Sequence, residues 1–190
     1  MAGSTILLRA AGFTALAAAA LQSTPVRAEE PAPALVEQFV QVCGTTQDAG
    51  PALPGTDVAA ADAPGFFAGD LQRAEDSRVV KVGERYAMRA LVPASADPQH
   101  AVFMKCALAG PGAFSEQVDG LSARVPGKPT LGKTAQGFDY ALFLDGATSF
   151  AVYAEPDGWV SMFKMDIMMR NIDRKYLKKG AKPQPIPPVR

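Results

Sequence analysis

The segment 127–134 contains a pattern that is tied to a specific chemistry. Gly127-Lys-Pro-Thr-Leu-Gly132-Lys-Thr matches G-x-x-x-x-G-K-[ST], a loop in which backbone N–H groups and a lysine hold phosphates. That chemistry requires a strand before the loop and a helix N-terminus after it, because the helix end supplies oriented N–H groups. Here a helical pattern precedes the loop and a strand pattern follows it, and Pro129 lacks an N–H. We therefore expect no nucleotide site and no cofactor.

Histidine and cysteine are too few for a serine-histidine relay or a zinc site. His100 is the only histidine, and no G-x-S-x-G motif provides a serine for it. Cys43 and Cys106 are the only cysteines, and an oxidised pair cannot bind a metal. A protein zinc site takes three or four ligands. We expect no metal site, and we interpret His100 as a polar turn residue.

Carboxylates are the remaining groups that could perform catalysis. Asp139, Asp145, Asp157 and Asp166 fall in or beside the last three predicted strands, but no two acids stand out as a catalytic pair. Asp145 and Asp157 are explained by predicted turns, and the other two by a solvated sheet face. The sequence thus favours a non-catalytic protein. A hydrolase of cell-envelope material that uses unidentified carboxylates stays open as the alternative.

The last predicted strand and the segment after it form the candidate interaction surface. Methionines and Trp159 cluster in the strand, where they either fill the core or form an adaptable binding face. From Lys164 onward, eight basic residues face two acidic ones, so the segment could dock on a protein or an anionic envelope component. A solvated, extended tail is the other interpretation. The residues chosen for this surface are Trp159, Met162, Lys175, Lys178 and Lys179.

Residues 1–28 have the parts of a secretory signal. Arg9 precedes an apolar run over residues 10–21, and Val26-Arg27-Ala28 fits a small-x-small cleavage site. The run is shorter than the about 20 residues that a membrane-spanning helix needs. We predict a periplasmic or secreted protein with no transmembrane segment in the mature chain. Removal of Arg9 and Arg27 leaves 17 basic against 19 acidic residues, which argues against nucleic-acid binding.

A disulfide between Cys43 and Cys106 is expected in an oxidising compartment. Cys43 lies on the apolar side of a predicted helix over residues 35–43, which Gly44 ends. Cys106 lies on the apolar face of a predicted strand, together with Met104 and Leu108. The helix should therefore lie across the sheet. In the chain-entropy model this bridge contributes about 4 kcal/mol to stability.

The remaining patterns predict an α+β domain over residues 29–169, followed by a basic, proline-rich tail over 170–190. Residues 45–77 are rich in Gly, Pro, Ala and Asp and read as mostly irregular chain. A second helix is expected from Phe114 to Val125. Asp-Gly turns near 146 and 158 predict a three-stranded antiparallel meander. Together these give an antiparallel sheet of about five strands, ββ-α-βββ, with the N-terminal helix and the second helix on one face. The predicted strands are 78–92, 102–108, 138–144, 149–154 and 159–168.

These observations predict an exported, non-catalytic binding module of the cell envelope. The inference rests on the predicted disulfide, the missing catalytic clusters and the basic tail beside an apolar strand. Architecture of this kind does not by itself imply a function.

Overall fold

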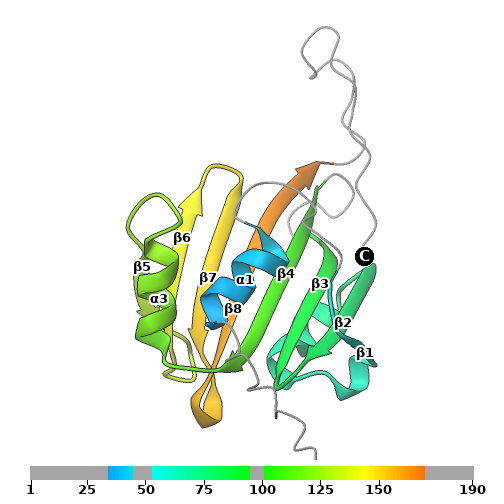
Figure 1. Ribbon diagram of the computed structural model, residues 1–190. Helices are drawn as coiled ribbons and strands as arrows, with labels where there is room; N and C mark the ends of the chain where they lie inside the picture. The colour runs from blue at the N-terminus through cyan, green and yellow to red at the C-terminus, as the bar shows by residue number, and fades with distance from the viewer. Residues whose placement is uncertain (1–33, 45–52, 95–100, 170–190) are drawn as a thin grey trace, which may run out of the picture. The chain divides into compact units, whose positions relative to one another are not determined.

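The computed structural model describes residues 34–44, 53–94 and 101–169 and contains one antiparallel sheet (Figure 1). The order of its strands is β1-β2-β3-β4-β8-β7-β6-β5. Each neighbouring pair is antiparallel. The strands are β1 Thr56–Val58, β2 Asp76–Val82, β3 Arg85–Pro93, β4 Ala101–Pro111, β5 Thr130–Lys133, β6 Asp139–Asp145, β7 Thr148–Ala154 and β8 Trp159–Met169.

The sheet consists of two meanders that meet at one central seam. Strands β1 to β4 follow one another in sequence and in space, and so do β5 to β8. The two meanders join where β4 pairs with β8 along its whole length, from Ala101 opposite Met169 to Pro111 opposite Trp159. Because successive side chains point to opposite faces of a sheet, every strand supplies residues to both faces.

Two helices pack on one face, which we call the helix face. Helix α1, Leu35–Cys43, packs on β4 and β8, and α3, Phe114–Ser122, packs on β7 and on α1; in Figure 1 both lie in front of the sheet. Gln117 Oε1 of α3 accepts a hydrogen bond of 3.1 Å from the backbone N–H of Val36, an early amide of α1 that has no partner within its own helix. The apolar core beneath the helices includes Phe39, Leu108, Leu121, Phe143, Phe150 and Met162.

The opposite face, which we call the groove face, carries a second apolar cluster. Short helical turns cover the part of it formed by β2, β3 and β4: η1 Ala60–Asp62, η2 Gly65–Phe67 and α2 Ala68–Leu71. Phe67 is fully buried and anchors these turns against small side chains of the sheet such as Ala90 and Ala107. The segment predicted to be irregular is thus pinned by an aromatic residue and packs on the sheet.

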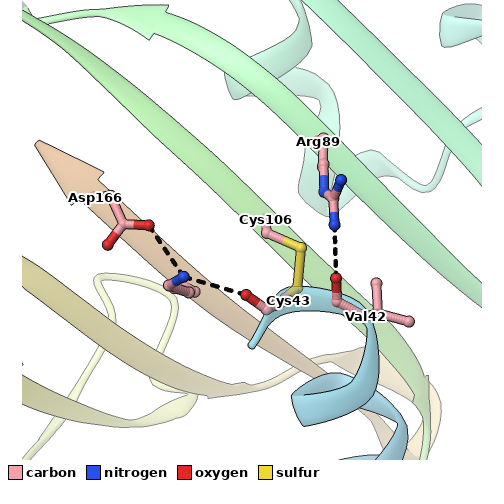
Figure 2. Close-up of a disulfide and its surroundings, with 6 residues drawn as sticks. Val42, Cys43, Arg89, Cys106 and Asp166 are labelled. Carbon is pink, nitrogen blue, oxygen red and sulfur yellow. Dashed lines mark hydrogen bonds and ion pairs between the residues drawn. A yellow bond between two sulfur atoms is a disulfide. The ribbon is translucent and has the colours of Figure 1, made fainter. Parts of the chain in front are cut away.

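The predicted disulfide is confirmed, and it lies in a buried polar row on the helix face (Figure 2). The Cα atoms of Cys43 and Cys106 are 5.6 Å apart. Arg89 on β3 and Lys164 on β8 pair with Cys106 from either side, so the three side chains lie in line across the sheet. Both basic residues are almost fully buried.

The two buried cations stabilise the C-terminal end of α1. Arg89 Nη2 donates to the carbonyl of Val42 at 2.7 Å, and Lys164 Nζ donates to the carbonyl of Cys43 at 3.2 Å. Those carbonyls belong to the last turn, where helix carbonyls lack intrahelical partners and the helix dipole favours positive charge. Asp166 lies 3.1 Å from Lys164 Nζ and accepts a hydrogen bond from Thr148. Each buried charge in the row therefore has a polar partner.

The predicted five-stranded ββ-α-βββ architecture is wrong, because the sheet has eight strands. The expected strand over 78–92 is two strands, β2 and β3, since the chain reverses at Gly83, whose φ is 63°. The other two strands that were not predicted are short strands at the edges of the sheet: β1 has three residues and β5 has four. The predicted meander is confirmed as β6, β7 and β8.

Several predictions fall outside the described residues. These are the signal peptide at 1–28, residues 45–52 of the glycine- and proline-rich segment, His100, and the basic tail at 170–190. Within the described ranges, no helix has the length and apolar character needed to cross a membrane.

Candidate functional site

Two adjoining cavities lie on the groove face, beside the edge of the segment that contains η2 and α2. The first, which we call the Trp159 cavity, has a volume of about 580 Å³. The second, which we call the Lys105 cavity, has a volume of about 320 Å³. Phe66, Tyr153 and Glu155 line both, so the two cavities form one groove. A groove of this size accommodates a small organic molecule.

Seven aromatic rings form a continuous chain along this groove. Successive ring centroids are 4.9 to 6.1 Å apart, which is the range of favourable aromatic pairs. Phe67 is fully buried, whereas the other rings keep some exposure. Half-buried rings offer apolar faces on which a ligand can pack. In order the chain is Tyr140, Tyr153, Phe163, Phe67, Phe66, Trp159 and Tyr86.

The connection between β7 and β8 brings the polar groups of the Trp159 cavity together. The 3-10 turn η3, Pro156–Gly158, joins the strands, and the backbone N–H of Glu155 donates to the carbonyl of Trp159 at 2.9 Å. Asp157 has a φ of 60°, a left-handed conformation that aspartate tolerates better than most residues. This tight connection places Glu155, Asp157 and Trp159 on the wall of the same cavity.

Glu155 is the acidic group of this groove whose pKa responds to burial. Burial raises the pKa of its carboxyl group, an effect that a hydrogen bond from Ser161 Oγ, 2.5 Å from Glu155 Oε1, partly opposes. Burial also raises the pKa of the Tyr153 hydroxyl, with further contributions from Tyr140, Asp70 and Glu155. Each of these two groups therefore favours its uncharged form more than it does in water.

An ion pair holds the wall of the Lys105 cavity against the sheet. Lys105 Nζ on β4 lies 2.6 Å from Asp70 Oδ1 on α2, and Arg73 Nη2 lies 3.1 Å from the same oxygen. Lys105 and Asp70 are both largely buried, so solvent screens their interaction less than it screens a surface pair. The ion pair fixes α2, and with it Phe66, relative to the groove.

A glycine makes room for the ring at the far end of the aromatic chain. Gly132 on the edge strand β5 pairs with Tyr140 on β6. A Cβ atom at Gly132 would lie 2.5 Å from the hydroxyl oxygen of Tyr140, much closer than non-bonded atoms approach. Gly132 therefore lets the Tyr140 ring lie across the edge strand, which gives the G-x-x-x-x-G-K-T pattern a packing role.

The rest of that pattern also has structural contacts. Strand β5 begins inside it, at Thr130, and β6 is the next element along the chain. No helix begins within the fully described segment 127–134 or directly after it. Lys133 Nζ lies 2.6 Å from a carboxylate oxygen of Asp139. The geometry lacks the helix N-terminus on which phosphate binding by this pattern depends.

The structure separates the residues chosen from sequence as an interaction surface. Trp159 lines the groove, whereas Met162 is fully buried on the helix face. The two side chains belong to the same strand but point to opposite faces. Lys175, Lys178 and Lys179 lie outside the described residues.

Sequence reasoning did not identify most of the groove. Phe66 comes from a segment without periodicity, and Glu155 is an isolated acid before a turn. One sequence pattern could have revealed part of the groove: in β8, Trp159 and Phe163 lie four residues apart and therefore share a face of the sheet. Within the described ranges, no cluster of three or more histidine, cysteine, aspartate or glutamate residues could hold a metal ion.

Comparisons of this chain with protein-family models, with curated proteins and with solved structures return no match. Its function is therefore inferred from the geometry of the groove and the pattern of the sequence.

Proposed function

We propose that this chain is an exported, non-catalytic binding module of the cell envelope whose ligand site is the aromatic groove. The observation that carries the proposal is the chain of seven aromatic rings beside two connected cavities. Aromatic side chains exposed in a concave site, with a few polar groups among them, are typical of small-molecule recognition. Of these rings, all described, Phe67 alone is fully buried, whereas rings that serve only as core are buried.

The natural fluorophore of the groove provides a direct test. Trp159 is the only tryptophan in the chain, so its emission reports on this cavity alone. We expect saturable, one-to-one binding of the uncharged dye N-phenyl-1-naphthylamine, detected as energy transfer from Trp159. The substitution Tyr153→Ala, in the wall shared by both cavities, should weaken dye binding about tenfold.

The control for Tyr153→Ala is a substitution that removes an apolar side chain outside the groove. Leu131 is 66% exposed and lines neither cavity, so Leu131→Ala should leave dye binding unchanged. Equal weakening by both substitutions would indicate general surface adsorption. Absence of saturable dye binding to the native chain would refute the proposal of a ligand site in the groove.

Export is the second part of the proposal, and it is supported by the sequence of residues 1–28 and is compatible with the disulfide. We expect protein recovered from its native compartment to have an intact mass that begins at Glu29. Cys43 and Cys106 should resist alkylation until they are reduced. An uncleaved chain with free thiols would contradict export.

The basic segment at 170–190 is a proposed contact with a protein or an anionic envelope component, on the evidence of its charge alone. If so, deletion of residues 170–190 should weaken capture of the protein on vesicles that contain anionic phospholipid. It should leave dye binding in the groove unchanged. Equal capture of the full and truncated chains would remove this role from the segment.

Hydrolysis of cell-envelope material is a second candidate function. Two carboxylates, Asp70 and Glu155, line the Lys105 cavity, and the pKa of Glu155 is raised, as a general acid requires. On this hypothesis the native chain should release soluble fragments from purified peptidoglycan, and Glu155→Gln should abolish that release. Absence of release by the native chain would exclude this activity on peptidoglycan.

A further inference from the structure

The Trp159 cavity combines aromatic rings with acidic side chains. Glu155 and Asp157 line it, together with ring faces that include those of Tyr86 and Trp159. None of the described residues that line this cavity is lysine, arginine or histidine. An anionic ligand would therefore meet repulsion, whereas a cation would meet carboxylates and the negative faces of aromatic rings.

Within the described residues Glu155 forms no ion pair, although Lys105, which pairs with Asp70, lines the adjoining cavity. The Glu155 carboxylate accepts a hydrogen bond from Ser161, and burial is the main influence on its pKa. No basic group within the described residues contributes to that shift. A positively charged ligand in the Trp159 cavity would pair with this carboxylate, and the attraction would be stronger than in water because the site is partly desolvated.

One ring of the cavity, that of Tyr86, already has an ammonium group beside it. Lys81 on β2 places its Nζ atom 5.8 Å from the centre of the Tyr86 ring, within the range of a cation–π contact. Lys81 is exposed and is not among the residues that line the cavity. Its charge should oppose a second cation on the same ring.

We infer that the Trp159 cavity binds a small organic cation, a quaternary or protonated alkylamine. Its charge is held by Glu155 and Asp157, and its alkyl groups pack on the aromatic rings. This inference rests on the proposed function of the groove as a ligand site and names the class of ligand. A cavity of about 580 Å³ lined mainly by apolar surface suits an organic ion better than a bare metal ion.

A pair of isosteric probes isolates the contribution of charge. Choline and 3,3-dimethylbutan-1-ol have nearly the same shape, but only choline is positively charged. We expect choline to change Trp159 emission saturably and to bind at least about tenfold more tightly than the neutral alcohol, as is typical of a desolvated cation–π site. Displacement of N-phenyl-1-naphthylamine by choline would place both in the same groove.

Three single substitutions test which charges are responsible. Glu155→Gln keeps the size of the side chain and should remove most of the preference for choline over the alcohol. Lys81→Met removes a competing cation and should tighten choline binding severalfold. Asp145→Asn, at an exposed acid that lines neither cavity, is the matched control and should change nothing. Retained dye binding in each variant shows that the groove is intact.

Two results would overturn the inference and are distinguishable from failure of the proposed function. If the dye binds but the alcohol binds as tightly as choline, the groove is a ligand site without selectivity for cations. If the dye binds and Glu155→Gln leaves the choline preference unchanged, the carboxylate does not recognise the charge. If neither the dye nor choline binds, the ligand site itself is refuted.

Discussion

At the scale of single residues, the buried arginine on β3 has a role that its type alone does not reveal. Arg89 is 2% exposed and donates to the carbonyl of Val42 in the last turn of α1. The guanidinium keeps its charge in the interior because it caps a helix end whose dipole favours positive charge. The helix and the sheet are thus held together by a polar contact beside the disulfide as well as by apolar packing.

Replacement of Arg89 by methionine should lower the free energy of unfolding by about 2–3 kcal/mol, because it leaves a buried carbonyl without its charged donor. Urea denaturation monitored by circular dichroism measures this loss. Arg78→Met is the matched control, since Arg78 pairs with Asp57 in a partly exposed position where ion pairs contribute about 0–1 kcal/mol. Equal losses in the two variants would contradict the capping role of Arg89.

Glu155 makes a pH-dependent contribution to stability. Its folded pKa is raised above the ordinary value of 4.5, so the folded chain holds a proton at pH values where the unfolded chain has released it. Stability from this group is therefore greatest below the unfolded pKa and falls as pH rises through the folded pKa. We expect Glu155→Gln to flatten the fall in stability above about pH 4.5, measured as the urea midpoint at a series of pH values.

Other ionisable groups near Glu155 make the comparison with Glu155→Gln essential to the measurement of stability against pH. Asp70, Tyr153, Asp157 and Lys105 also line the groove around Glu155, and all four side chains are ionisable. Only the difference between the native chain and Glu155→Gln isolates the glutamate. A difference that does not depend on pH from 4 to 8 would contradict the raised pKa.

At the scale of elements, the edge strand β5 owes its geometry to Gly132. Gly132→Ala should force the Tyr140 ring away, because the added Cβ would overlap it. We expect a loss of about 1 kcal/mol in unfolding free energy and a shift of the Tyr140 ring signals in NMR spectra. Weaker dye binding should accompany the shift, because the Tyr140 ring packs beside that of Tyr153, which lines both cavities.

Gly69 in α2 is the matched glycine, because an added Cβ there meets nothing within 4 Å. Gly69→Ala should therefore stabilise the chain by about 0.5–1 kcal/mol. If Gly132→Ala stabilised the chain to the same extent, the Tyr140 ring would not need the space that the glycine leaves.

The elements also show how far the sequence could predict the fold. Helix α1 was predictable at both ends, because its apolar spacing and Gly44 act locally. The turn between β2 and β3 was missed because Gly83-Glu84 is not a strong hairpin signal. The alternation of side chains does change at this turn: the groove face carries odd-numbered residues before it, such as Val79, and even-numbered residues after it, such as Tyr86. Strands β1 and β5 are too short for periodicity to reveal them.

The site was less predictable than the fold for a physical reason. Its rings come from η2, β3, β6, β7 and β8, and only the register of the sheet brings them together. Alternation in β8 places Trp159 on one face and Met162 on the other, so a cluster in the sequence becomes two surfaces in the structure. Local patterns carry no information about such long-range contacts.

At the scale of the whole molecule, the disulfide constrains the chain around the polar row. It closes a loop with a sequence separation of 63 residues. Its reduction should lower the unfolding free energy by about 4 kcal/mol in the chain-entropy model. Urea midpoints with and without dithiothreitol measure the change, and Cys43→Ala/Cys106→Ala should reproduce it without a reductant. Midpoints that do not differ would show that the packing and capping of α1 hold it in place unaided.

The seam between β4 and β8 has a consequence for the synthesis of the chain. β4 ends at Pro111, whereas β8, with which it pairs at the seam, begins only at Trp159. During synthesis β4 is therefore complete before β8 is made, and until then one edge of β4 has no partner strand. Open edges of long strands are templates for aggregation. A chain that ends at residue 158 should be recovered in aggregates, whereas the full chain stays in solution. Until β8 is available, that edge stays unpaired only if a chaperone covers it or folding is delayed, and export in an unfolded state, as proposed above, would provide that delay.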